Sequence, residues 1–176
     1  MFRKIENKYY GDKISVQFKT IDSFLTLASE VMNKRKSRAG WSLEHHLSAA
    51  FRKNDLTFDR GKRTEGKKKP DFIFPGIEAY HNTAYNSDRL VFLGAKTTCK
   101  DRWRQILNEA DRIKPKHLFT LQQGISSNQL SEMQNSGVVL VVPSPYKNGF
   151  PIEHQNNLLS LKEFIQKTYS KIVGSA

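Results

Sequence analysis

The chain has 176 residues, enough for one domain with a sizeable hydrophobic core and short for two. Its 29 lysines and arginines against 17 acidic residues leave a formal net charge of +12, which favours a polyanionic partner over a neutral metabolite. Nucleic acid is the leading partner, and the alternative is a basic protein whose charge serves only solubility.

Cysteine content and the length of apolar runs indicate the cellular compartment in which the protein is expected to act. The single cysteine, Cys99, excludes an internal disulfide and has no Cys or His neighbours at zinc-ligand spacing. No apolar run approaches the roughly 20 residues needed to cross a bilayer, and residues 1–13 lack the apolar stretch of a signal peptide. We therefore expect a reduced, cytoplasmic setting without membrane contact.

The N-terminal segment is predicted to contain two helices separated by a hinge. Residues 1–19 alternate weakly in hydropathy, which is compatible with an edge strand or an arm. Apolar residues at helical spacing predict a helix over residues 21–33. The basic stretch 34–40 is expected to be a hinge, and a second helix begins after Ser42, with Glu44 in its first turn.

A basic loop leads into the first strand that carries a candidate site residue. Residues 59–70 hold six lysines and arginines and two glycines, which predicts a surface loop that is either solvated or in contact with phosphates. Asp71 and the apolar run 72–74 follow directly. A second apolar run, 91–93, predicts a strand that ends at Lys96. We therefore expect Asp71 and Lys96 at the ends of neighbouring strands.

An amphipathic helix is predicted after Lys96. Thr98 with Asp101 forms a plausible N-terminal cap, and Pro115 ends the helix. The apolar positions follow helical spacing: Trp103, Ile106, Leu107, Ala110 and Ile113. Arg102 and Glu109 are separated by two helical turns, so we expect them on one face of this helix.

The C-terminal half predicts a crossover connection. Residues 117–122 and 138–142 have strand composition, and residues 128–135 between them have the pattern of a short helix closed by Gly137. This alternation predicts an α/β fold in which a central mixed sheet is flanked by helices.

Two stretches are expected to be irregular, and one final helix is expected to end the chain. Residues 75–88 and 143–157 are rich in turn residues. Ser160 followed by Glu163 is a capping box, which predicts that the last helix begins at this point.

The charged residues around the predicted strand ends suit phosphodiester hydrolysis. This reaction needs a divalent cation, an activated water and positive charge on the phosphate in the transition state. Asp71 and Glu109 offer hard carboxylate ligands that suit Mg²⁺, and Lys96 can orient the water or stabilise charge. Taken one at a time, each of these residues is also compatible with an ordinary surface or ion-pair position.

The order of these residues resembles a known nuclease family. Asp71 after a proline, followed by Lys96, is similar to the PD-(D/E)xK nuclease motif, and the segment AKTTCKDRWRQILNEAD resembles the catalytic segment of the EcoRII-type type II restriction endonucleases. Flanking segments resemble that family in the same order: RAGWSLEHHL, GKKKPDFIFPGIEAYH, HLFTLQQG and SGVVLVVP. The resemblance covers roughly residues 38–144 and implies a restriction-endonuclease-like fold. With the chain length, we expect residues 1–176 to form a single nuclease domain, with an arm and helix (1–37), a catalytic core (38–144) and a loop with the last helix (145–176).

The resemblance also assigns roles to individual residues. The usual motif has an acid two residues before the lysine, where this chain has Gly94. In the EcoRII-type branch the acid comes from the following helix, which implies Glu109, and a further glutamate comes from an earlier helix, which implies Glu44. Tyr80 matches a family position near the active site, although the residue by itself suggests a partly buried core tyrosine.

Base recognition is implied for the residues that follow the catalytic lysine, Lys100, Asp101 and Arg102. In the major groove, lysine or arginine can donate to guanine and aspartate can accept from cytosine, so this triplet suits a C·G step. The alternative is that Asp101 caps the helix and Arg102 pairs with Glu109 or faces solvent. Trp41 could stack on an extruded base, or it could be a core residue. Expected contacts to the DNA backbone are Arg38, Arg60, Lys62, Arg63, Lys67, Lys68 and Lys69.

Together these features predict a sequence-specific, Mg²⁺-dependent endonuclease of double-stranded DNA. The resemblance implies a CC/GG palindrome with a central spacer, CCNGG or CCWGG-like, a homodimer, and a cognate methyltransferase that protects host DNA. Two alternatives remain: a structure-specific repair or junction nuclease of the same superfamily, and a basic DNA-binding module without catalytic activity.

Overall fold

The chain forms two compact units in a computed structural model that describes residues 2–174, without the side chains of Phe2 and Asp101. Contacts divide the chain into Met1–Trp41 and Ser42–Ala176, and the whole sheet lies in the second unit. None of the helices in residues 2–174 combines the length and the apolar character that a membrane crossing needs.

The first unit begins with helix α1 (Phe2–Ser15). The Glu6 carboxylate accepts two hydrogen bonds from Arg35, each 2.9 Å long, and the Tyr10 hydroxyl donates to Glu30 at 3.2 Å. Glu6 and Tyr10 are one helical turn apart, so they lie on the same side of α1. Of the two possibilities that the sequence left open here, an edge strand or an arm, the strand is not formed, because the residues that make contacts repeat at helical and not at strand spacing.

The second helix, α2 (Ile21–Lys53), continues without a break into the second unit. The predicted hinge at residues 34–40 was therefore wrong. Lysine and arginine are good helix formers, and one interior glycine, Gly40, costs a helix only about 1 kcal/mol relative to alanine. Trp41 is 59% exposed, so the prediction of a core tryptophan was also wrong.

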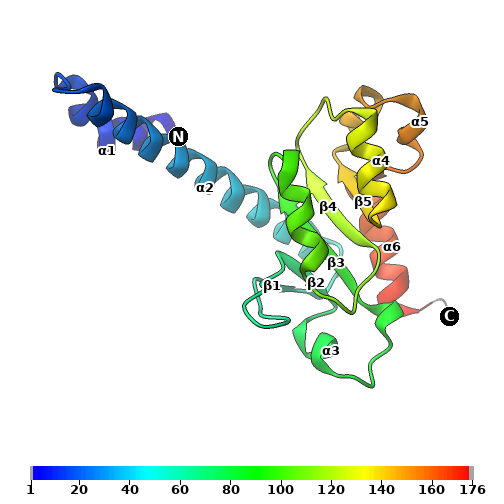
Figure 1. Cartoon of the computed structure of the whole chain (residues 1–176). Helices are drawn as coiled ribbons and strands as arrows, with labels where there is room; N and C mark the ends of the chain where they lie inside the picture. Colours follow the sequence, from blue (N-terminus) through cyan, green and yellow to red (C-terminus); the bar gives the residue numbers. More distant parts are fainter. Residues whose placement is uncertain (1, 175–176) are drawn as a thin grey trace. The chain divides into compact units, whose positions relative to one another are not determined.

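Six strands form one mixed sheet in the order β1 to β6, which confirms the predicted architecture (Figure 1). β1, β2 and β3 pair antiparallel, whereas β3, β4, β5 and β6 pair parallel. The strands are β1 (Asp59–Arg60), β2 (Phe72–Phe74), β3 (Val91–Lys96), β4 (Lys116–Thr120), β5 (Val138–Val142) and β6 (Leu159–Ser160).

Helical segments connect the strands. They are α3 (Ile77–His81), η1 (Ser87–Arg89), η2 (Lys100–Asn108), α4 (Ser127–Asn135), η3 (Ser144–Gly149), α5 (Ile152–Gln155) and α6 (Leu161–Val173), where η denotes a 3₁₀ helix. The stretches 75–88 and 143–157, expected to be irregular, thus contain short helices. The capping box of α6 is confirmed, because Ser160 Oγ accepts from the Glu163 amide at 3.2 Å and Glu163 Oε2 accepts from the Ser160 amide at 2.6 Å.

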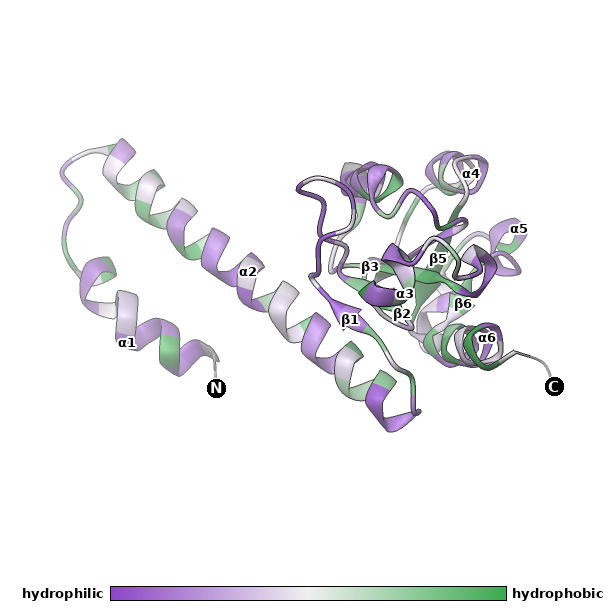
Figure 2. Cartoon of the chain, turned by 90° about the horizontal axis from the view of Figure 1, so that it is seen from below, coloured by the Kyte–Doolittle hydropathy of each residue, from purple (hydrophilic) through white to green (hydrophobic). Residues whose placement is uncertain are grey.

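Alternating strand residues fill two hydrophobic layers, one on each face of the sheet. In β3, Phe92 joins the layer that η2 and α4 cover, whereas Val91 and Leu93 join the layer that α6 covers. Leu43 to Phe51 of α2 also contribute to the second layer. Figure 2 shows α4 and α6 on opposite sides of the sheet. The period of two along each strand therefore determines which helix packs on which face.

Candidate active site

Asp71 and Lys96 form the centre of the candidate site. Asp71 immediately precedes β2, and Lys96 is the last residue of the neighbouring antiparallel strand β3. Lys96 Nζ lies 2.8 Å from Asp71 Oδ2, and the amide of Ala95 donates to the same oxygen at 2.7 Å. The two side chains are only 18% and 17% exposed, so the strand ends hold a half-buried charged pair, as the sequence predicted.

Glu109 is coupled electrostatically to this pair. Burial raises the pKa of the Glu109 carboxyl to about 7, and the negative charge of Asp71 adds to the increase, whereas Lys96 and Lys116 oppose it. A glutamate titrating near neutral pH among other carboxylates is typical of functional sites. The Glu109 carboxyl is therefore within electrostatic range of Asp71 and Lys96.

Glu44 approaches the same group from helix α2. Burial and the charge of Asp71 raise the pKa of Glu44, while Arg60 and Lys96 lower it. Its Oε2 atom lies 3.7 Å from Nε of Arg60. The charges of four of the five residues predicted to be catalytic thus act on one another from four segments of the chain: Asp71, Lys96, Glu109 and Glu44.

The elevated pKa of Glu109 leads to a prediction about stability and pH. A carboxyl whose folded-state pKa exceeds its unfolded value makes the folded state bind more protons, so stability falls as pH rises from about 4.5 to about 7. Glu109→Gln removes this pH-dependent loss of stability, because glutamine does not titrate. Between pH 5 and pH 8, the unfolding free energy of the variant minus that of the wild type is expected to rise by about 1–3 kcal/mol.

Urea unfolding in chelator measures this difference, in which contributions from other titrating groups cancel. The exposed Glu78 provides a matched control, because Glu78→Gln is expected to leave the pH profile unchanged. Parallel profiles for wild type and Glu109→Gln would contradict the assigned environment of Glu109.

The local structure around Glu109 differs from the prediction. η2 ends at Asn108, Glu109 has extended backbone angles of φ −100° and ψ 142°, and Ala110 has a φ of 51°. The prediction that Arg102 and Glu109 share one helical face was therefore wrong. The chain leaves the helix before Glu109, and this turn separates the carboxylate from the face that carries Arg102.

Gly94 stands where the usual motif has an acid, and its surroundings are tightly packed. A Cβ atom on Gly94 would lie 3.0 Å from Cγ2 of Ile106 and 3.4 Å from Cδ1 of Leu118. η2 therefore packs closely on β3, and a side chain at residue 94 would press against Ile106. Glu109 follows the end of this closely packed segment.

The carboxylates fit a divalent cation that retains water ligands. Both hydrogen bonds to Asp71 fall on Oδ2, and among the described residues no donor is assigned to its Oδ1 or to the Glu109 carboxylate. Within residues 2–174, no three acidic, histidine or cysteine side chains form a complete metal site. Mg²⁺ binds through one or two carboxylates together with waters and substrate phosphate, so Asp71 and Glu109 suffice as protein ligands.

Tyr80 forms its hydrogen bonds with residues other than the four charged ones. It is 2% exposed, its hydroxyl donates to Glu65, and Arg112 donates to its carbonyl oxygen. Glu65 Oε1 also accepts from the amide of Asp111 at 3.2 Å. Tyr80 thus helps to attach the basic loop to the turn after Glu109, and a direct catalytic role for it stays a prediction.

The basic loop lies beside Asp71 and carries six of the seven predicted backbone contacts. Arg60 pairs with Glu44, and Lys68 Nζ lies 3.4 Å from Asp111. The other four are exposed: Lys62, Arg63, Lys67 and Lys69. The seventh, Arg38, belongs to the first unit, where it pairs with Glu6.

Two glutamines that sequence analysis missed hold the predicted recognition segment. Gln122 Oε1 accepts from the amides of Cys99 at 2.8 Å and Lys100 at 3.2 Å, and Gln129 Nε2 donates to the Lys100 carbonyl at 2.6 Å. Lys100 and Arg102 are exposed, and the side chain of Asp101 lies outside the described part of the chain. Nothing in the sequence marks these glutamines, because their partners are more than 20 residues away.

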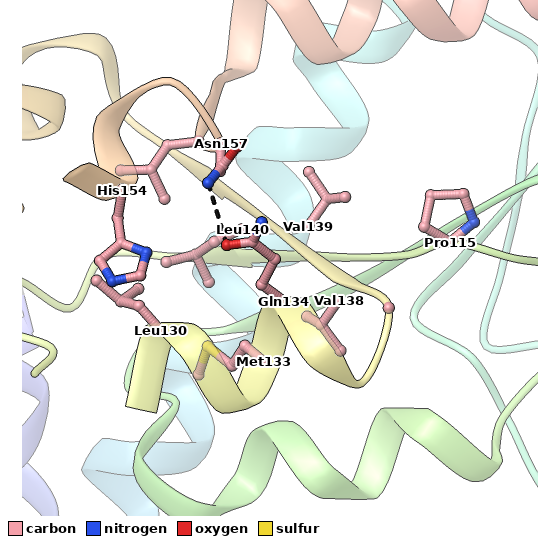
Figure 3. Close-up of a pocket in the computed structure, with 11 residues that line it drawn as sticks. Pro115, Leu130, Met133, Gln134, Val138, Val139, Leu140, His154 and Asn157 are labelled. Atoms are coloured by element: carbon pink, nitrogen blue, oxygen red, sulfur yellow. Dashed lines mark hydrogen bonds between the residues drawn. The ribbon is translucent and has the colours of Figure 1, made fainter. Parts of the chain in front are cut away.

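A separate pocket carries no comparable chemistry. Its volume is about 310 Å³, and mostly apolar side chains from α4, β5 and the α5 region line it (Figure 3). Asn157 Nδ2 donates to Gln134 Oε1 at 3.0 Å across its polar edge, close to His154. Its lining contains no acid, lysine or arginine, so we place the candidate active site at the strand ends.

The fold and the paired acid and lysine define a restriction-endonuclease-like domain. Two solved structures share the fold: "Metal-depleted Ecl18kI in complex with uncleaved, modified DNA", with a TM-score of 0.73 and 22% identity over 99% of this chain and 57% of that one, and "Metal-depleted Ecl18kI in complex with uncleaved DNA", with 0.71 and 24% over 98% and 60%. The sequence model of the EcoRII C-terminal family matches residues 2–165, and the chain belongs to this family.

Curated relatives agree with this assignment. The type II restriction enzyme EcoRII of Escherichia coli is 49% identical over 166 residues, which cover 94% of this chain and 41% of EcoRII. The type II restriction enzyme SsoII of Shigella sonnei is 27% identical over 150 residues, covering 80% of this chain and 48% of SsoII. The chain thus spans about half the length of the curated relatives it matches.

Proposed function

We propose that this chain is the catalytic domain of a type II restriction endonuclease that hydrolyses double-stranded DNA with Mg²⁺ as cofactor. The proposed target is a CC/GG palindrome with a central spacer, CCNGG or CCWGG-like. The observation that carries the proposal is the half-buried Asp71–Lys96 pair coupled to Glu109, in a member of the EcoRII C-terminal family.

The side chains divide the work of hydrolysis. Asp71 and Glu109 would hold Mg²⁺, which supplies positive charge and lowers the pKa of bound water. The ammonium of Lys96, held by Asp71, orients the attacking water and stabilises charge on the phosphate. Glu44, paired with Arg60, adds a carboxylate at the rim of this group.

DNA is the proposed partner because basic residues both precede Asp71 and follow Lys96 in the sequence. The basic loop before Asp71 would contact phosphates without reading sequence. Lys100, Asp101 and Arg102 would read the C·G pairs in the major groove. Gln122, in the segment after β4, and Gln129, in α4, support this role, since both bond the backbone of Lys100.

A homodimer, a cognate methyltransferase and a cytoplasmic location complete the proposal. A palindromic site matches a two-fold symmetric dimer. The first unit has exposed apolar side chains that a second copy could cover: Ile5, Tyr9, Ile14, Phe24, Leu25 and Met32. An enzyme that cuts a short DNA sequence requires protection of host DNA in the same compartment, and the methyltransferase would supply it.

Plasmid digestion tests this function. Wild-type protein and Asp71→Ala are incubated with a plasmid of known sequence, with Mg²⁺ or with chelator, and every cut is mapped. We expect discrete cuts at CC/GG palindromes by the wild type with Mg²⁺ alone. Both the chelator and the Asp71 variant are expected to abolish cutting, because each removes the metal from the site.

Other outcomes would favour the alternatives. Cuts at branched or damaged DNA, independent of sequence, would indicate a structure-specific repair or junction nuclease. Binding that is equally tight with and without Mg²⁺, with no cutting under any condition, would indicate a DNA-binding module. The control variant Asp111→Asn changes an exposed acid beside the basic loop, and it is expected to cut like the wild type.

A further inference from the structure

Lys116 is a buried lysine to which the proposed chemistry assigns no role. It is 4% exposed, and its ammonium donates to the backbone carbonyl oxygens of Glu109 and Ala110. The same nitrogen lies 5.1 Å from the centroid of the Phe92 ring. Burying an ammonium is costly unless acceptors surround it, so these contacts are what make the position tenable.

The two carbonyls belong to the turn that directs Glu109 toward the site. Glu109 is extended, and Ala110 has a φ of 51°, in the left-handed region that residues with a Cβ rarely adopt. An unfavourable conformation of this kind persists only where surrounding contacts impose it. Lys116 supplies such contacts to the carbonyl oxygens of the two peptide groups that flank Ala110.

Lys116 is itself held on the sheet. It is the first residue of β4, its Cα pairs with Val138 of β5, and its amide donates to the Gly137 carbonyl at 3.0 Å. β4 also pairs in parallel with β3, where Lys96 lies opposite Thr120. The Lys116 side chain therefore ties the Glu109 backbone to the same sheet that carries Lys96.

We propose that Lys116 is a positioning residue that holds the Glu109 carboxylate in register with Asp71 and Lys96. It acts through the Glu109 backbone and touches neither the substrate nor the metal in this assignment. The inference rests on the proposed function, because it concerns how Glu109, a proposed metal ligand, is held in position. The competing view is that Lys116 only stabilises the fold.

Lys116→Met tests this role, because methionine keeps the length and apolar stem and removes the donor. Changes in residues that orient metal ligands typically cost 10- to 100-fold in metal affinity or activity. We expect a single-turnover cleavage rate about 10- to 100-fold lower, and Mn²⁺ binding by the protein–DNA complex weaker by a similar factor. DNA affinity in chelator is expected to stay unchanged.

A double-mutant cycle separates positioning from general stability. In a Glu109→Gln background, Lys116→Met is expected to cause no further loss of Mn²⁺ affinity, because the carboxylate that Lys116 positions is already gone. If Lys116→Met does not fold, Lys116→Gln, which replaces the ammonium by a neutral amide, takes its place in the same cycle. The exposed Lys114, two residues away, is the control, and Lys114→Met is expected to behave like the wild type.

Two results would overturn the inference. One is a Lys116→Met protein with wild-type cleavage and Mn²⁺ affinity, and the other is a full additional loss in the Glu109→Gln background. Both are distinct from failure of the proposed function, in which the wild-type protein itself would not cut DNA.

Discussion

Lys96→Ala is expected to lower the single-turnover rate of DNA cleavage by about 100- to 1,000-fold, the usual effect of removing one group that stabilises transition-state charge. The ammonium that bonds Asp71 Oδ2 at 2.8 Å is then absent, and no charge replaces it beside the phosphate. DNA binding in chelator is expected to remain, since the basic loop supplies the phosphate contacts. Quenched-flow cleavage at saturating protein measures the rate.

Lys171→Ala is the matched control for this variant. Lys171 is an exposed lysine of α6, and α6 covers the sheet face opposite η2, so its removal changes the net charge equally without touching the strand ends. Wild-type rates are expected. Equal rates for Lys96→Ala and Lys171→Ala would remove Lys96 from the reaction.

Arg102→Ala is expected to reduce the preference for CC/GG sites over unrelated duplex by about 10- to 100-fold, the value of one good bidentate contact to guanine. Arg102 is exposed on η2, directly after the backbone that Gln122 and Gln129 hold. Weak binding that depends steeply on salt is expected to persist, because phosphate contacts carry it. Dissociation constants for cognate and scrambled duplexes at two salt concentrations measure the change.

Arg104 offers the control on the same element. Its guanidinium pairs with Glu132 at 2.7 Å and lies 4.8 Å from the Trp103 ring centroid, contacts that suit a structural role. Arg104→Ala is expected to retain sequence preference. If Arg102→Ala discriminated between duplexes as well as the wild type, base reading would have to be assigned to other residues.

Interpretation of local patterns failed where distant contacts override the signal. The helix predicted to run from Thr98 to Pro115 ends at Asn108, because Glu109 and Ala110 turn away under contacts from Lys116 and Glu65. The expected hinge at residues 34–40 is continuous helix instead. In the first case partners elsewhere in the chain select the conformation, whereas in the second the helix propensity of lysine and arginine outweighs the single glycine.

Local patterns succeeded where one face of an element is buried. The apolar runs of the longer strands, and the capping box of α6, depend only on neighbouring residues. The pairing of Asp71 with Lys96 was predictable for the same reason, since both lie at the ends of strands marked by apolar runs.

The sequence by itself thus determined the mixed sheet, the family and the placement of Asp71 and Lys96 at the strand ends, because short segments contain the strand composition and the motif order. Only the tertiary structure decided that Glu109 leaves its helix, that Gly94 is packed against Ile106, and that Lys116, Gln122 and Glu65 bond the backbone on both sides of η2. The contacts of these residues join segments brought together by packing, and periodicity within one segment carries no information about them.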